Sequence, residues 1–321
     1  MPLPLIEPFA DEHLDAAGAL LAERHARHRE AEPFLPARYE DPATARAEVE
    51  ALWRADDTPG AVAIRDGRVV GFVVGARKPD EMWGANVWVD PAGLAVERAE
   101  DARDLYAAAA AKWVAAGRTA HYAVVPASDA ELVDAWFRLG FGQQHAFGIR
   151  ELGDGDEEWP DGVREAEPPD VDELVRLDPV LAEHQLLSPV FSRRPYDEDE
   201  DELRGELEDE IASERAGLLV AERDGRIVGS FSLHPLDVSS MHAGLARPDG
   251  ASFLAWAATL PDARGSGAGL ALTQASFAWA RARRYPAMVT DWRVTNLLSS
   301  RFWPRRGFRT TFVRLHRLIA G

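Results

Sequence analysis

The sequence predicts a mixed α/β protein in which one fold of roughly 150 residues occurs twice in tandem. The segment AIRDGRVVGFVVG (63–75) resembles AERDGRIVGSFSL (221–233), and WFRLGF (136–141) resembles WPRRGF (303–308). Each member of the first pair reads as a strand, an Asp-Gly turn and a second strand, which is the signal of a β-hairpin. Strands and helices follow each hairpin, so we expect each copy to form a central twisted mixed sheet flanked by helices.

An acidic segment rich in glycine and proline, ELGDGDEEWPDGVREAEPPD (151–170), separates the two copies. This composition is typical of a linker that runs into the first strand of the next domain. We therefore expect a first domain at residues 1–152 and a second domain at residues 163–321.

Periodicity and turn residues predict the elements of the second copy. The acidic run DEDEDELRGELEDE (197–210) has leucines at helical spacing, so we interpret it as a solvated helix. Further along, Leu270 and Phe277 lie seven residues apart, which favours one apolar helix face. The expected elements, in chain order, are a strand at 163–166, helices at 170–186 and 199–214, strands at 217–222, 226–234 and 251–260, a helix at 267–284, a strand at 287–293, a helix at 296–305 and a strand at 308–318.

Composition argues against several classes of function. The net charge is −18, and an acidic surface repels nucleic-acid phosphates and anionic lipids. The chain has no cysteine, which excludes disulfides, cysteine metal ligands and a cysteine nucleophile. No apolar run approaches the roughly 18 residues of a membrane helix, and the N-terminus lacks a secretory leader pattern. We expect a cytoplasmic protein with no nucleic-acid partner, no membrane partner and no metal.

Three glycines, Gly265, Gly267 and Gly269, follow Arg264 between a predicted buried strand and a predicted helix. The first turn of a helix leaves N–H groups unpaired and is partly positive, and glycines let an anion approach the backbone closely. The segment lacks the Gly-Lys-Ser/Thr of a phosphate loop, and it is a poor match to the dinucleotide fingerprint. It therefore predicts an anion site of another kind, the alternative being a tight turn without a ligand.

A second motif, NLLSSRFWPRRGF, begins at Asn296, which lies 32 residues after Arg264. The two motifs resemble the R/Q-x-x-G-x-G/A and N-x-x-A-x-x-L-Y-x-x-x-G-F signatures of the Gcn5-related N-acetyltransferase (GNAT) superfamily, in the expected order and at the expected separation. The chain is similar to tandem-domain, actinobacterial-type members of that superfamily. The resemblance covers the whole second copy and extends weakly, through the internal repeat, over the first.

This resemblance implies acetyl-coenzyme A (acetyl-CoA) as the acyl donor, its pyrophosphate bound by backbone N–H groups of the glycine turn. It also implies that Ala257 and Thr259 pair with the pantetheine arm and that Asn296 bonds near it. Trp303 replaces a family tyrosine often proposed to reprotonate the thiolate, and an indole cannot supply that proton. The cofactor-binding residues so expected are Ala257, Thr259, Arg264, Gly265, Ser266, Gly267, Ala268, Gly269, Asn296 and Trp303.

Acetyl transfer to an amine requires a base within hydrogen-bond reach of the amine. Asp291 stands five residues before Asn296 and is the first candidate, with an ion-pair role as the alternative. His234, after a strand on the expected substrate side, is the second candidate, because histidine titrates near neutral pH. The resemblance places substrate contacts in the helical segment that lines the acceptor pocket of relatives. The substrate candidates are His184, Phe191, Tyr196 and Trp256.

The first copy departs from both motifs. Counting back from its Gly-Phe pair places Asp129 at the asparagine position and Trp136 at the aromatic position. The place of the glycine turn is taken by ERAEDA (97–102), whose carboxylates repel a pyrophosphate. We expect this degenerate domain to keep the fold without the cofactor.

The sequence thus predicts an acetyl-CoA-dependent N-acetyltransferase that acts on a small-molecule amine, with the active site in the C-terminal domain. Two alternatives stay open, a mycothiol-synthase-like acetyltransferase and a non-catalytic acyl-CoA-binding sensor or scaffold. A monomer whose copies form an internal pseudo-dimer and a homodimer are both compatible with the sequence.

Overall fold

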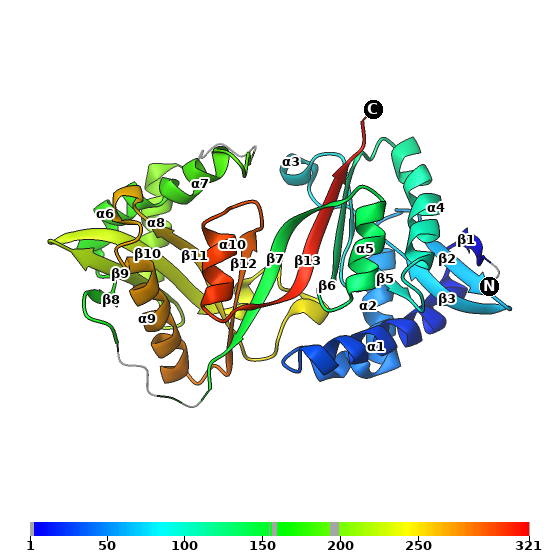
Figure 1. Cartoon of the computed structure of the whole chain (residues 1–321), viewed down its shortest axis with the longest axis horizontal. Helices are drawn as coiled ribbons and strands as arrows, with labels where there is room; N and C mark the ends of the chain where they lie inside the picture. Colours follow the sequence, from blue (N-terminus) through cyan, green and yellow to red (C-terminus); the bar gives the residue numbers. More distant parts are fainter. Residues whose placement is uncertain (1–2, 154, 156–158, 193–198, 321) are drawn as a thin grey trace. The chain divides into compact units, whose positions relative to one another are not determined.

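The computed structural model describes residues 3–153, 155, 159–192 and 199–320 (Figure 1). The chain forms two compact units. Unit 1 consists of residues 1–147, 242–249 and 310–321, and unit 2 consists of residues 148–241 and 250–309. The units differ from the two sequence copies, because two segments of the second copy are built into unit 1. The predicted domain limits, 1–152 and 163–321, describe the sequence copies and stay a prediction.

Unit 1 contains a four-stranded antiparallel sheet in the order β1-β2-β3-β5. A second group of strands pairs β4 in parallel with β6, and β6 antiparallel with β13, the last strand of the chain. The strands are β1 (Leu5–Pro8), β2 (Ala61–Arg65), β3 (Arg68–Val73), β4 (Asn86–Val89), β5 (Leu94–Val96), β6 (Ala120–Pro126) and β13 (Arg309–Leu318). β7 (Gly142–Glu151) runs from residues of unit 1 into residues of unit 2.

Helices cover both faces of the first sheet of unit 1. Successive side chains of a strand point to opposite faces. Accordingly, Ala61 and Ala63 of β2 share a core with Leu105 of α4, whereas Val62 between them shares a core with Leu21 of α1. The helices are α1 (Leu14–Ala31), α2 (Pro42–Arg54), the short α3 (Asp80–Trp83), α4 (Asp101–Ala115) and α5 (Ala130–Arg138).

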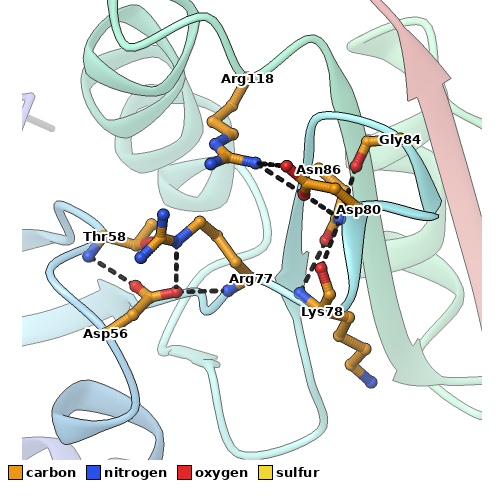
Figure 2. A network of polar contacts seen from close by, with 8 residues as sticks. All are labelled: Asp56, Thr58, Arg77, Lys78, Asp80, Gly84, Asn86 and Arg118. Carbon is orange, nitrogen blue, oxygen red and sulfur yellow. Dashed lines mark hydrogen bonds and ion pairs between the residues drawn. The ribbon is translucent and has the colours of Figure 1, made fainter. Parts of the chain in front are cut away.

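A polar network fixes the segment between β3 and β4 (Figure 2). The fully buried Asn86 donates from Nδ2 to the carbonyls of Lys78 (2.8 Å) and Gly84 (2.7 Å), and its Oδ1 accepts from the Lys78 N–H at 2.9 Å. Arg118 donates to both carboxylate oxygens of Asp80, at 2.7 and 2.8 Å. These partners satisfy the polar groups of the segment from within unit 1, so we assign the network a structural role.

The strands of unit 2 pair in the order β12-β11-β10-β9-β8, antiparallel except for the parallel pair of β11 and β12. They are β8 (Val163–Glu165), β9 (Gly217–Arg223), β10 (Arg226–Pro235), β11 (Ser252–Thr259) and β12 (Ala287–Arg293). The helices are α6 (Val171–Leu177), α7 (Pro179–Leu186), α8 (Glu200–Ala212), α9 (Ala268–Ala282) and α10 (Ser299–Arg305).

The core of unit 2 also alternates along its strands. Leu218 and Val220 of β9 join a cluster with leucines of α6 and α8. Gly217 meets α9 instead, because a Cβ at that position would lie 2.2 Å from Nε1 of Trp279. Helices therefore pack on both faces of this sheet, and α9 approaches its face closely.

Most predicted elements of the second copy agree with the observed ones within three residues. The helix expected at 170–186 is wrong as one helix: α6 ends at Leu177 and α7 begins at Pro179, since a proline inside a helix lacks an N–H and clashes with the preceding turn. The acidic run forms α8 over its described residues, with Leu203 and Leu207 buried. None of the helices in the described part of the chain has the length and hydropathy that crossing a membrane requires.

Candidate active site

The strands β11 and β12 pair along only a short part of their length. Their parallel register covers Ser252 and Phe253 of β11, and the Thr290 hydroxyl donates to the Leu254 carbonyl at 3.0 Å. The opposite edge of β11 pairs with β10 from residue 252 to residue 259. A bulge in that pairing leaves Ala255 out of register and exposed. The later residues of β11 therefore have no registered strand partner on the β12 side in the described structure.

A cavity of about 470 Å³ lies at this divergence, within unit 2. It is lined by residues of α7, β11, the glycine turn, β12 and α10. The sequence-predicted residues that line it are His184, Trp256, Ala257, Thr259, Arg264, Gly265, Gly267, Gly269, Asp291, Asn296 and Trp303. The fold thus brings together in one cavity residues from the two sequence motifs and from the helical segment before them.

The glycine turn adopts the backbone that its sequence suggests. Gly265 and Gly267 have φ values of 78° and 95°, a region that other residues rarely enter, and Gly267 immediately precedes α9. A Cβ at either position would meet no protein atom within 4 Å, so open space rather than packing adjoins the turn. The first-turn N–H groups of α9 have no intrahelical partner. The turn therefore presents backbone donors beside open space.

Ser266 and Ala268 support this turn and do not line the cavity among its described residues. The Ser266 hydroxyl accepts from the Ala268 N–H at 3.4 Å, and the Ser266 carbonyl accepts from the Arg223 guanidinium. Arg264 is exposed, lines the cavity and forms no ion pair with any described carboxylate. Its charge is therefore available to an anion at the turn.

Asn296 is buried, with 4% of its surface exposed, and organises the start of α10. Its Oδ1 accepts hydrogen bonds from the backbone N–H groups of Leu298 (3.0 Å) and Ser299 (3.4 Å). The same oxygen lies 3.3 Å from Nε2 of His184 on α7. Asn296 thus holds the turn that leads into α10 and connects the second motif with α7.

Trp303 packs in an aromatic cluster at one wall of the cavity. Its ring centroid lies 4.9 Å from Phe302, 5.5 Å from Phe308 and 5.9 Å from Phe231, and only 6% of its surface is exposed. A Cβ on Gly269 would lie 3.6 Å from the Phe302 ring, so this glycine lets α9 lie close to the cluster. The packing accounts for an aromatic residue at position 303, and it gives the indole no role in proton transfer.

Asp291 is half-buried on β12 and is the one carboxylate among the described residues that line the cavity. Arg293, two residues further along the same strand, also lines the cavity and donates from Nε to Oε1 of Gln185 at 2.9 Å. The cavity therefore contains a carboxylate and a guanidinium, of opposite charge, on one strand beside α7.

Two other candidates lie away from this cavity. His234 is on β10, where its Nε2 lies 2.8 Å from the Ser232 hydroxyl and 3.3 Å from Glu210, outside the residues that line this cavity. His234 therefore lies away from this cavity, and its role as the second candidate base stays a prediction. Phe191 is 68% exposed and does not line the cavity, and Tyr196 lies outside the residues that the structure describes.

Sequence reasoning missed Gln185 and Ala255, and it considered Arg293 only as an ion-pair partner of Asp291. Gln185 follows His184 on the same helix, and Arg293 shares the face of β12 with Asp291 because strand side chains alternate. These spacings could have predicted that both residues lie beside the candidate site. The bulge that exposes Ala255 had no such signal, because it depends on the register of β10 against β11.

The corresponding place in unit 1 is acidic. A cavity of about 560 Å³ at the start of α4 is lined by Glu97, Arg98, Ala99, Glu100, Ala130, Glu131, Asp134 and Arg138. Arg138 is shared between Glu100 and Asp134, at 2.9 Å from each. The predicted carboxylates of the ERAEDA segment are therefore present where unit 2 has its glycine turn.

Arg24 of α1 occupies the interior of unit 1 beside a broken strand. β4 and β5 are separate strands, whereas β11 in unit 2 is continuous. The guanidinium of Arg24 donates to the carbonyl of Leu94 and, at 2.6 Å, to that of Pro91. Burial lowers the pKa of Arg24 to about 10, and the carboxylate of Asp129 opposes that change, so the side chain is charged at neutral pH.

Comparison with known proteins agrees with this architecture. The model of the acetyltransferase (GNAT) family matches residues 181–308. A GCN5-related N-acetyltransferase from Sphaerobacter thermophilus has a similar structure over 100% of this chain and 98% of its own, with 16% identity and a TM-score of 0.59. The glucosamine N-acetyltransferase region of a fungal multi-domain GH3 β-N-acetylglucosaminidase is similar over 99% of this chain and 38% of its own, with 17% identity and a TM-score of 0.53. No curated protein sequence matches the chain.

The fold and the cavity define a two-unit α/β protein of the acetyltransferase class. The match to the GNAT family model falls within the second copy, and the full-length structural similarity shows the same fold over the whole chain.

Proposed function

We propose that unit 2 is an acetyl-CoA-dependent N-acetyltransferase for a small-molecule amine and that unit 1 carries no cofactor. The observation that carries the proposal is one cavity that joins a glycine-rich helix start, an unpaired strand edge and a single carboxylate. Each of these features corresponds to one requirement of acyl transfer.

The glycine turn fits a pyrophosphate. Backbone N–H groups at the start of α9 and the Arg264 guanidinium are donors of the right charge, and the space beside Gly265 and Gly267 is open. The free edge of β11 offers backbone groups to an extended pantetheine amide chain, in the manner of an added strand. Ala257 and Thr259 lie on that strand and line the cavity.

Asp291 is the proposed base. It accepts the proton of the attacking amine, directly or through water, while backbone N–H groups on the free edge of β11 are available to the oxyanion. As the acyl carbon bonds to the amine nitrogen, its bond to sulfur breaks and the thiolate requires a proton.

The first test is release of coenzyme A over a panel of small amines, with Asp291→Asn as the matched isostere. General-base catalysis contributes on the order of 10²- to 10⁴-fold to the rate. The variant's kcat/KM is therefore expected to be lower than that of wild type by a factor in this range near pH 7. The loss should shrink at high pH, where the amine is already neutral. A loss of less than about threefold in the folded variant would assign Asp291 a structural role.

A second candidate, a non-catalytic acyl-CoA sensor, is favoured by one observation. Trp303 is buried in an aromatic cluster where the family signature has a tyrosine. Acetyl-CoA binding without coenzyme A release, over the whole panel of amines, would support the sensor and contradict the enzyme.

A further inference from the structure

The thiolate that leaves in this reaction needs a proton, and Trp303 cannot provide it. An indole N–H does not ionise near neutral pH. The inference below rests on the proposed function and concerns which side chain takes the place of the family tyrosine.

The hydrogen bonds of Asn296 fix the tautomer of His184. The Asn296 oxygen accepts from two backbone N–H groups, those of Leu298 and Ser299, which identifies this atom as the amide oxygen. An amide oxygen has no proton to give. His184 Nε2, at 3.3 Å, must therefore be the donor, and it carries a hydrogen in both the neutral and the charged ring.

The other ring nitrogen of His184 is left for proton exchange. Nδ1 makes no hydrogen bond to any residue of the described chain, and it is not among the buried polar atoms without a partner. His184 is half-buried and lines the cavity. Nδ1 is thus accessible, and imidazole is the side chain that exchanges protons most readily near neutral pH.

The charged side chains near His184 belong to the cavity wall, to the packed helix α6 and to α7 itself. In the cavity they are Asp291 and Arg293 of β12 and Arg264 of the glycine turn, while β11 contributes none. On the packed helix α6, Asp172 pairs with Arg204, Glu173 accepts from the Ile227 N–H, and Arg176 is exposed. On α7 itself, Glu183 is exposed.

We propose that His184 is the catalytic acid, with Asn296 as its positioning residue. The amine nitrogen bonds to the acyl carbon and gives one proton to Asp291, the carbon–sulfur bond breaks, and Nδ1 of the His184 imidazolium gives one proton to the sulfur. Solvent then returns a proton to His184 and removes one from Asp291. One acetyl group and one proton are thereby transferred, without any oxidant or metal.

The test uses the binary complex with coenzyme A, so it needs neither an amine nor turnover. An imidazolium beside a sulfur stabilises the thiolate and lowers the thiol pKa. Ultraviolet absorbance of the thiolate is followed against pH for wild type, His184→Gln and Glu183→Gln. Glutamine at position 184 keeps an N–H donor for Asn296 but cannot titrate, and Glu183→Gln places the same residue at the neighbouring exposed position of α7.

In wild type and in Glu183→Gln, the acid dissociation constant of the coenzyme A thiol is expected to be at least tenfold larger in the complex than in solution. In His184→Gln this shift should disappear while the Kd for coenzyme A stays within about threefold. Equal thiol titration in all three proteins would overturn the proposal. Failure of coenzyme A to bind to wild type would overturn it together with the proposed function.

With an amine substrate, a second readout separates acid catalysis from positioning. His184→Gln should lower kcat by about 10²-fold and remove the alkaline decline that a general acid gives to the pH profile of kcat, because a glutamine amide cannot act as a general acid. A lowered kcat with that alkaline decline retained would show that another group is the acid. If no amine is turned over, the proposed function fails, and the thiol titration still decides the assignment of His184.

Discussion

Each copy of the fold has a turn between a strand and the helix that follows it, and the two turns present opposite chemistry. Gly265 and Gly267 in unit 2 leave open space beside backbone donors and the exposed Arg264. The counterpart in unit 1 presents Glu97 and Glu100 at the start of α4. Both turns connect a strand to a helix, so the difference lies in charge and in access to the backbone.

The backbone that precedes each turn also differs between the units, because it is open to a cavity in unit 2 and bonded to a side chain in unit 1. In unit 2 the edge of β11 faces a cavity, whereas in unit 1 Arg24 binds the carbonyls of Pro91 and Leu94. Both units keep a side-chain acceptor before the next helix: Asp129 accepts from the Leu132 N–H at 3.0 Å, and Asn296 accepts from the Ser299 N–H at 3.4 Å. We conclude that a repeat can keep the contacts that maintain the fold while its own side chains replace the contacts that a cofactor would make.

The largest expected difference between the units appears on acidification. Burial, reinforced by the Arg24 charge, lowers the pKa of His25 to about 4 and of His28 to about 3. The unfolded state therefore binds more protons than the folded state below about pH 6.5, so stability is complete above that pH and falls as pH decreases toward 4 and 3. Unit 1 should lose on the order of 5 kcal/mol between pH 7 and pH 4.

Urea unfolding at several pH values, with hydrogen exchange of α1 and α9 peptides as the readout, measures this loss for each unit. His28→Phe is the control, because it keeps the aromatic contact with Phe312 and cannot be protonated. An unchanged pH dependence of α1 in that variant would show that His28 is not responsible.

The next effect concerns the glycine turn. Asp and Asn are isosteric and both tolerate positive φ, so Gly267→Asp and Gly267→Asn differ only in charge. A carboxylate about 4 Å from a phosphate costs about 4 kcal/mol at an effective dielectric constant of 20. Gly267→Asp should therefore weaken acetyl-CoA binding on the order of 10²- to 10³-fold, and Gly267→Asn by much less.

Isothermal titration calorimetry decides both the affinity and the number of sites. Wild type should bind one acetyl-CoA per chain, because the turn of unit 2 offers open space beside backbone donors, whereas carboxylates line the corresponding turn of unit 1. Equal affinities of the two variants, or a plateau at two per chain, would contradict the contrast between the turns.

The smallest effect comes from exchanging an arginine for methionine in each unit. Arg24→Met leaves two buried carbonyls without their donor and should destabilise unit 1 by about 3 kcal/mol, with acetyl-CoA affinity unchanged. Arg264→Met removes an exposed charge and should weaken acetyl-CoA binding by less than about tenfold, with stability unchanged. The Kd for acetyl-CoA and the unfolding curve are measured for both variants and compared. An effect of Arg24→Met on the Kd would argue against a purely structural role of Arg24 within unit 1.

The sequence by itself determined the features that depend on neighbouring residues. The positive φ of Gly265 and Gly267, the start of α9 and the order of elements from β8 to β13 all follow from local conformational preference and hydrophobic period. The spacing of Asp291 from Asn296 along one strand and turn placed both residues in the same cavity for the same reason.

Only the tertiary structure decided which distant segments meet. The pairing of β13 with β6 and the burial of Leu245 in the core of unit 1 join residues far apart in the sequence. The contact of His184 with Asn296 spans 112 positions, and that of Arg24 with Leu94 spans 70. Such contacts depend on strand register and on the packing of whole elements, which no local pattern encodes, and they determine which unit keeps an open site.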